Sequence, residues 1–143
     1  MIKLKSAEYD MNTGISTAII KTELGTFTGT TKLHEEDKDI VSNFAGCEYA
    51  EMRAIIKYAK AKIQEQRIKV KTLENAKLTI EQLKGYEKNS PESRQIRKLY
   101  FIELNKLNQY KERLEFLKSN LYTQMKDRRQ KIKEILDKAA TKN

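Results

Sequence analysis

Residues that build disulfide frameworks and many active sites are scarce in this sequence. Its 143 residues include one cysteine, one histidine, one proline and no tryptophan. A single thiol cannot form an intramolecular disulfide, so we expect Cys47 to be a buried free thiol in a reducing compartment, the cytoplasm. No apolar run approaches the roughly 20 residues that span a bilayer, and no signal peptide precedes the first predicted strand. We therefore expect no membrane segment.

Catalytic motifs are also missing. The sequence has no Gly-rich nucleotide-binding loop, no cluster of metal-ligand residues and no Cys–His pair that helical periodicity would bring together. His34 falls at a predicted strand-to-helix junction, where structural hydrogen bonding is the simpler role. Glu48 and Glu51 share a helix face, but acids in a first helical turn need no catalytic role. We predict that the chain is not an enzyme and uses no cofactor.

The first third of the chain predicts a β-sheet. Four of the five glycines lie there, together with the Thr and Ile residues that favour strands. Turns at residues 12–14 and 24–25 separate three runs of strand character, which predicts a three-stranded antiparallel sheet. Gly29 lies inside the third run, so we expect a β-bulge there, with a close approach of another backbone as the alternative.

The rest of the chain predicts helices. We expect a short helix near residues 37–45, ended by Gly46, and then long helices at about residues 47–84 and 91–138. Apolar residues recur there in steps of three and four, typical of a coiled-coil seam, although Gln66 and Arg128 are among the polar residues at seam positions.

The organisation follows from the connector between the long helices. Residues 85–89 are polar, and Ser90-Pro91-Glu92 is typical of a helix start, so the helices form an antiparallel hairpin. The predicted fold class is therefore α+β. Residues 1–46 form the sheet and short helix, residues 47–143 form the hairpin, and both belong to one structural unit.

Apolar surface on the hairpin exceeds what one seam can bury. Hydrophobic residues make up only 38% of the chain, which favours extended helices with much solvated surface over one large core. Several aromatic residues nevertheless lie outside the seam of the second helix: Tyr100, Phe101, Tyr110, Phe116 and Tyr122. We expect self-association to cover them, so the chain is predicted to be a homo-oligomer, dimeric or higher.

Charge divides the chain in two. Residues 1–51 hold five Lys against nine acidic residues, a net charge of −4, whereas residues 52–143 hold 24 basic against 11 acidic residues, a net charge of +13. A basic helical half suits an anionic ligand, either nucleic acid or a phosphorylated small molecule. The alternative is a Lys-rich solvated helix surface in which Lys and Glu alternate.

One candidate binding region surrounds Gly46. Asn43 and Phe44 precede it and Arg53 follows two turns later, which predicts a pocket for phosphates and a base at a helix N-terminus. We expect Phe27 or Phe44 to offer a ring face to an adenine and Asn43 to hydrogen-bond a ribose or base edge. A core role for Phe44 is the alternative.

A second cluster lies near the C-terminus, where Tyr122, Met125, Arg128 and Arg129 combine aromatic surface with the fork-shaped donors that bind phosphate. An antiparallel hairpin with helices of similar length returns this cluster to residues 47–55. We therefore predict that Arg128 and Arg129 contact ligand phosphate. Solvated charges at a helix C-terminus are the alternative.

Residues 24–29 (LGTFTG), 32–34 (KLH), 36–37 (ED) and 44–54 (FAGCEYAEMRA) resemble the first family of Thoeris anti-defence proteins from phages. The resemblance is concentrated in the first 60 residues. It implies an N-terminal β-sheet with two long helices. It also implies that the chain binds and sequesters cyclic ADP-ribose isomers, the signals of bacterial TIR-domain enzymes, without cleaving them.

The resemblance further implies assembly through the helices, and some members of that family hold cyclic oligonucleotide signals at a second site. Two other functions remain open from the residues alone. A helical scaffolding protein would use its arginines to contact acidic neighbours. A nucleic-acid-binding protein would use the basic helices, and its affinity would fall steeply with salt.

Overall fold

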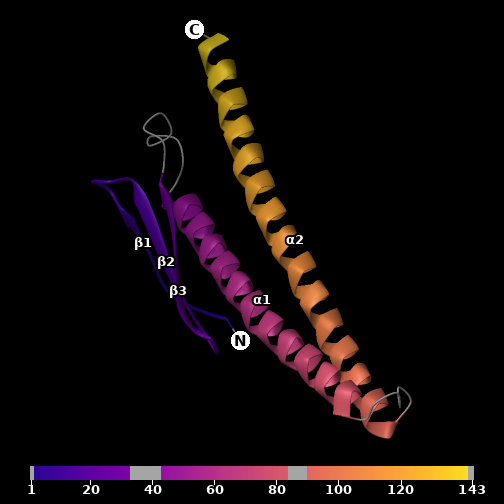
Figure 1. The fold of residues 1–143 in the computed structure, drawn as a ribbon. Helices are drawn as coiled ribbons and strands as arrows, with labels where there is room; N and C mark the ends of the chain where they lie inside the picture. Colours follow the sequence, from indigo (N-terminus) through magenta and orange to yellow (C-terminus); the bar gives the residue numbers. More distant parts are fainter. Residues whose placement is uncertain (1, 33–42, 84–89, 142–143) are drawn as a thin grey trace. The chain divides into compact units, whose positions relative to one another are not determined.

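The fold, described by a computed structural model over residues 2–32, 43–83 and 90–141, is the predicted α+β arrangement (Figure 1). Strands β1 (Lys3–Asp10), β2 (Ile15–Thr22) and β3 (Gly25–Lys32) form an antiparallel sheet in the order β1-β2-β3. Two helices follow, α1 (Asn43–Leu83) and α2 (Pro91–Thr141). Gly14 and Gly25 have φ angles of 70° and 117° in the two turns, a backbone conformation that favours glycine.

The prediction that Gly46 ends a short helix is wrong. α1 begins at Asn43 and runs through Gly46 without a break, while residues 37–42 of the predicted short helix lie outside the described residues. Gly46 instead lets the first turn of α1 lie against β2. A Cβ atom at this position would come within 2.3 Å of the Ser16 hydroxyl oxygen. The glycine is there because of packing, not helix termination.

The predicted bulge at Gly29 is also wrong, and the alternative is confirmed. The β2–β3 register is unbroken, and the sheet's irregularity falls between Leu4 and Ser6 in β1. At Gly29 the backbone of α1 crosses β3 so closely that a Cβ atom would lie 2.0 Å from the carbonyl oxygen of Ala50 and 2.4 Å from the nitrogen of Ala54. The absent side chain is therefore a condition for helix-on-sheet packing.

The chain divides into two compact units, Met1–Tyr58 with Glu115–Asn143, and Ala59–Leu114. In the first unit, α1 covers one face of the sheet, and β2 alternates buried and partly exposed residues as expected for a sheet with one covered face. Ile20, Ala54 and Tyr58 form its core, with Leu24 and Phe27 packed against them. A second cluster joins α1 to α2 through Tyr49 and Leu121.

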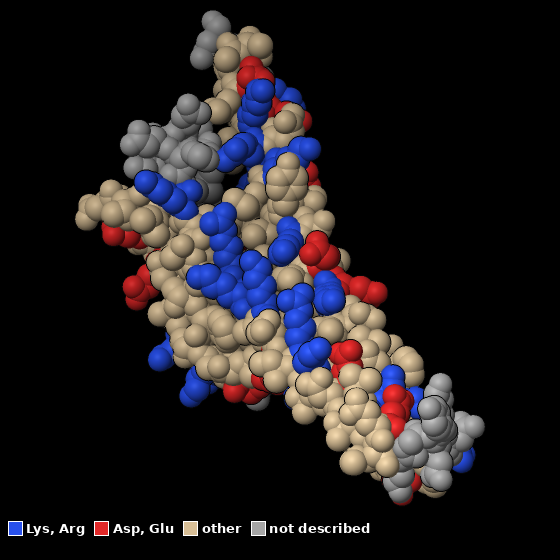
Figure 2. Space-filling model, in the orientation of Figure 1, with Lys and Arg blue, Asp and Glu red and all other residues tan. Residues whose placement is uncertain are grey.

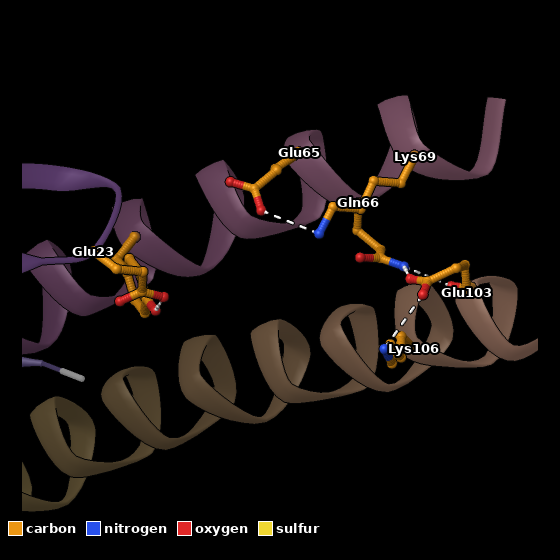
Figure 3. Close-up of polar contacts among 7 residues, drawn as sticks. Glu23, Glu65, Gln66, Lys69, Glu103 and Lys106 are labelled. Carbon is orange, nitrogen blue, oxygen red and sulfur yellow. Dashed lines mark hydrogen bonds and ion pairs between the residues drawn. The ribbon is translucent and has the colours of Figure 1, made fainter. Parts of the chain in front are cut away.

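The second unit contains the remaining parts of the helices, which are antiparallel. Ile63, Val70, Leu107 and Leu114 are buried there. Gln66, the polar residue at a seam position, is buried and donates to the Glu103 carbonyl oxygen at 2.8 Å and to its carboxylate at 2.6 Å (Figure 3). The bond from Gln66 is the main cause that lowers the Glu103 pKa, and Lys106 adds to it. Such a polar pair in an apolar seam favours one register of the two helices.

The helix ends agree closely with the sequence. α1 ends at Leu83 where residue 84 was predicted, and α2 extends to Thr141 instead of 138. The start of α2 at Pro91 is confirmed, and Ser90 caps it by accepting the Ser93 N–H at 3.2 Å. Within the described ranges, neither helix contains a stretch long and apolar enough to cross a membrane.

Candidate functional site

The C-terminal part of α2 lies beside the first turns of α1, where the antiparallel prediction placed it. Leu121 and Met125 pack against the buried Tyr49 ring, and Met52 and Ile56 complete this contact. The Tyr49 hydroxyl donates to the carbonyl oxygen of Gln124 at 3.5 Å. Two segments more than 70 residues apart in sequence therefore share one surface in the first unit.

Arg128 is the charged group at this contact. Its guanidinium lies over the Tyr49 ring, 5.4 Å from the centroid, and its Nη2 atom donates to Glu48 Oε2 at 3.3 Å. The side chains of Arg128 and Glu48 are each 40% exposed, so water reaches both. Burial raises the pKa of Tyr49, and the positive charge of Arg128 partly opposes that rise. The result is a partly exposed guanidinium that lies on a buried aromatic ring.

A second basic group lies along β3. Arg53 donates to the Thr30 carbonyl at 3.0 Å and Lys57 to the Thr28 carbonyl at 2.7 Å. The two cations are one helical turn apart on α1, and among the described residues β3 pairs with β2 alone, so they bind alternate carbonyls of an edge strand. Figure 2 shows Lys and Arg side chains gathered over the N-terminal half of α1.

The structure separates the predicted site residues. It brings Met125 and Arg128 to the Tyr49 contact, while Tyr122 is 69% exposed and Arg129 is exposed on the same helix. Phe27 packs in the sheet–helix core, its ring edge-on to Tyr58 at 5.8 Å between centroids.

Three more of the predicted residues lie at the start of α1. Gly46 is buried against Ser16. Asn43 and Phe44 form the first turn, and their side chains lie outside the described part of the structure. The predicted pocket around Gly46 therefore stays a prediction.

Glu48, Tyr49 and Lys57 are site residues that sequence reasoning did not assign. An acid at 48 could have been matched to Arg128 from the antiparallel register, because the prediction already returned residue 128 to the start of the first long helix. Lys57 follows Arg53 by one turn, but no feature of the sequence predicts that this face of the helix packs against β3.

The described residues contain no group of three or more His, Cys, Asp or Glu side chains that could hold a metal ion. No protein-family model, curated protein or solved structure matches the chain. The assignment of function therefore depends on the site geometry and on the sequence resemblance.

Proposed function

We propose that this chain is a phage anti-defence protein that binds and sequesters cyclic ADP-ribose-type immune signals in the cytoplasm of the infected bacterium, without cleaving them. The observation that carries the proposal is the partly exposed Arg128 guanidinium, held on the Tyr49 ring beside the start of α1. The resemblance of residues 44–54 to the Thoeris anti-defence family includes Tyr49 and Glu48.

The chemistry of such a signal suits this surface. Cyclic ADP-ribose carries two phosphates, and a guanidinium binds phosphate oxygens through several charge-assisted N–H donors. Arg128 uses one nitrogen for Glu48, and its other donors can reach a ligand from the exposed side. The positive end of the α1 dipole adds to the attraction for anions near this surface. Binding alone depletes a signal, so no catalytic group is required.

The direct test is recovery of the ligand. Purified protein is incubated with cyclic ADP-ribose or its isomers, separated from free ligand, denatured, and the released nucleotide is identified by mass spectrometry. We expect the intact cyclic nucleotide in a fixed ratio to protein. Recovery of a linear product would show an enzyme, and absence of any bound nucleotide would favour the scaffolding alternative.

We also propose that the protein acts as a homo-oligomer, because several large apolar side chains of α2 are exposed. Phe101, Phe116 and Ile135 are 56%, 63% and 66% exposed. Phe116→Glu is expected to lower the mass measured by light scattering at micromolar concentration while the circular dichroism of the helices stays unchanged, because the charge would have to be buried in the interface. Thr123→Glu, an exposed site on the same helix, should leave the mass unchanged. A monomeric wild-type protein would contradict the proposal.

A further inference from the structure

Arg128 already has an anion beside it in the free protein. Glu48 Oε2 lies 3.3 Å from Arg128 Nη2, and this is the one partner that the described residues give to the Glu48 side chain. The carboxylate therefore stands where we expect the ligand phosphate. Any phosphate that binds Arg128 has to displace this carboxylate or bind beside it against charge repulsion.

We propose that Glu48 is an internal competitor for the anion site: it holds Arg128 in the free protein and gives way to the ligand phosphate. The inference rests on the proposed function for the presence of a phosphate ligand. It assigns to Glu48 a role in specificity, because only an anion that binds Arg128 more strongly than one carboxylate can take its place.

The geometry favours exchange at Glu48 and not movement of Arg128. The guanidinium lies over the ring of Tyr49, which is 4% exposed. The Tyr49 hydroxyl also donates to the Gln124 carbonyl, so the ring under the cation is held in place. Glu48 is 40% exposed and makes a single oxygen–nitrogen contact. Such an exposed pair is weak, because water screens it and the long side chains lose freedom in forming it. A diphosphate brings more charge and can accept two parallel N–H donors.

The consequence is a few-fold preference for ligands that carry more charge. A weakly charged molecule gains little from Arg128 once Glu48 is displaced, whereas a diphosphate-bearing signal gains more than the exposed pair contributes. Removing the charge of Glu48 should therefore increase the affinity for phosphate ligands, which is the opposite of what loss of an ordinary ligand-binding residue does.

The test uses inorganic pyrophosphate as the probe and the full chain. Isothermal titration calorimetry compares the wild type, Glu48→Gln and Glu51→Gln, which removes an equal charge from the same helix. We expect Glu48→Gln to bind pyrophosphate about two- to fivefold more tightly, the range that an exposed ion pair is worth, and Glu51→Gln to change the affinity less. Equal or weaker binding by Glu48→Gln, or no binding by either protein, would overturn the inference.

A second variant separates exchange from a general gain in positive charge. In an Arg128→Ala background, Glu48→Gln should no longer increase the affinity for pyrophosphate, and a gain that persists there would overturn the role given to Glu48. The two proposals fail in different ways. If the wild type does not retain cyclic ADP-ribose isomers but the Glu48→Gln gain appears, the proposed function fails and the anion exchange stands. If the wild type retains the signal without that gain, only the exchange fails.

Discussion

Replacing Arg128 and Arg129 together by alanine is expected to weaken the binding of cyclic ADP-ribose isomers by about 10²-fold or more. Each lost hydrogen bond from a charged donor to a phosphate costs on the order of 1.5–3 kcal/mol, so two such losses exceed two decades of affinity. Arg129 is exposed and Arg128 is 40% exposed, and both lie in the middle of a long helix, so the helix content should not change. Calorimetry with the wild type and the variant measures the difference.

Two controls show whether the lost affinity belongs to these positions. Lys126→Ala with Lys131→Ala removes the same charge from exposed sites of the same segment, so it should change affinity by only the small amount that screened charges contribute. Arg128→Lys keeps the charge but loses the fork of donors, and it should fall between the wild type and Arg128→Ala. If the double arginine variant binds as well as the wild type, both residues are solvated helix-end charges and the proposed site is elsewhere.

Much of the fold could be predicted because its signals are local. The Thr and Ile residues of the first third, and the glycines at the two turns, predict a meander without reference to the rest of the chain. Ser90-Pro91 likewise predicts where α2 begins. Antiparallel helices followed from a short connector, and with them the return of Arg128 to the start of α1.

The errors have one physical origin, the packing of α1 on the sheet. A glycine within a predicted helix suggests a break, and a glycine within a predicted strand suggests a bulge. Gly46 and Gly29 are glycine for another reason: another element passes close to each. Whether a helix crosses a strand at such a point depends on contacts between distant segments, which one sequence does not display. The partner of Arg53 is missed for the same reason, since the Thr30 carbonyl belongs to a strand 23 residues earlier.

The largest expected effect on stability is at Gly29. Gly29→Ala places a Cβ atom 2.0 Å from the Ala50 carbonyl oxygen and 2.4 Å from the Ala54 nitrogen, and both atoms belong to the backbone of α1. No side chain can rotate away, so α1 has to move off the sheet and loosen the core around Ile20. We expect a loss of at least about 3 kcal/mol in the free energy of unfolding, at the upper end of overpacking costs, measured by urea denaturation. Thr28→Ala, on the exposed neighbouring residue, should cost far less.

Gly46 offers the matched comparison, because the atom in its way is part of a side chain. Gly46→Ala would meet Ser16 Oγ at 2.3 Å, and that buried hydroxyl has no hydrogen-bond partner within the described structure. Ser16→Ala removes the 2.3 Å contact without leaving a donor or acceptor unpaired, and leaves only a 3.3 Å contact with the Cβ atom of residue 16. The variant carrying both changes should therefore recover most of the stability lost in Gly46→Ala. The same Ser16→Ala change should not rescue Gly29→Ala, whose clash is with backbone. A Gly29→Ala protein as stable as the wild type would mean that α1 does not lie on β3 at this distance, and the contacts of Arg53 and Lys57 with that strand would have to be abandoned with it.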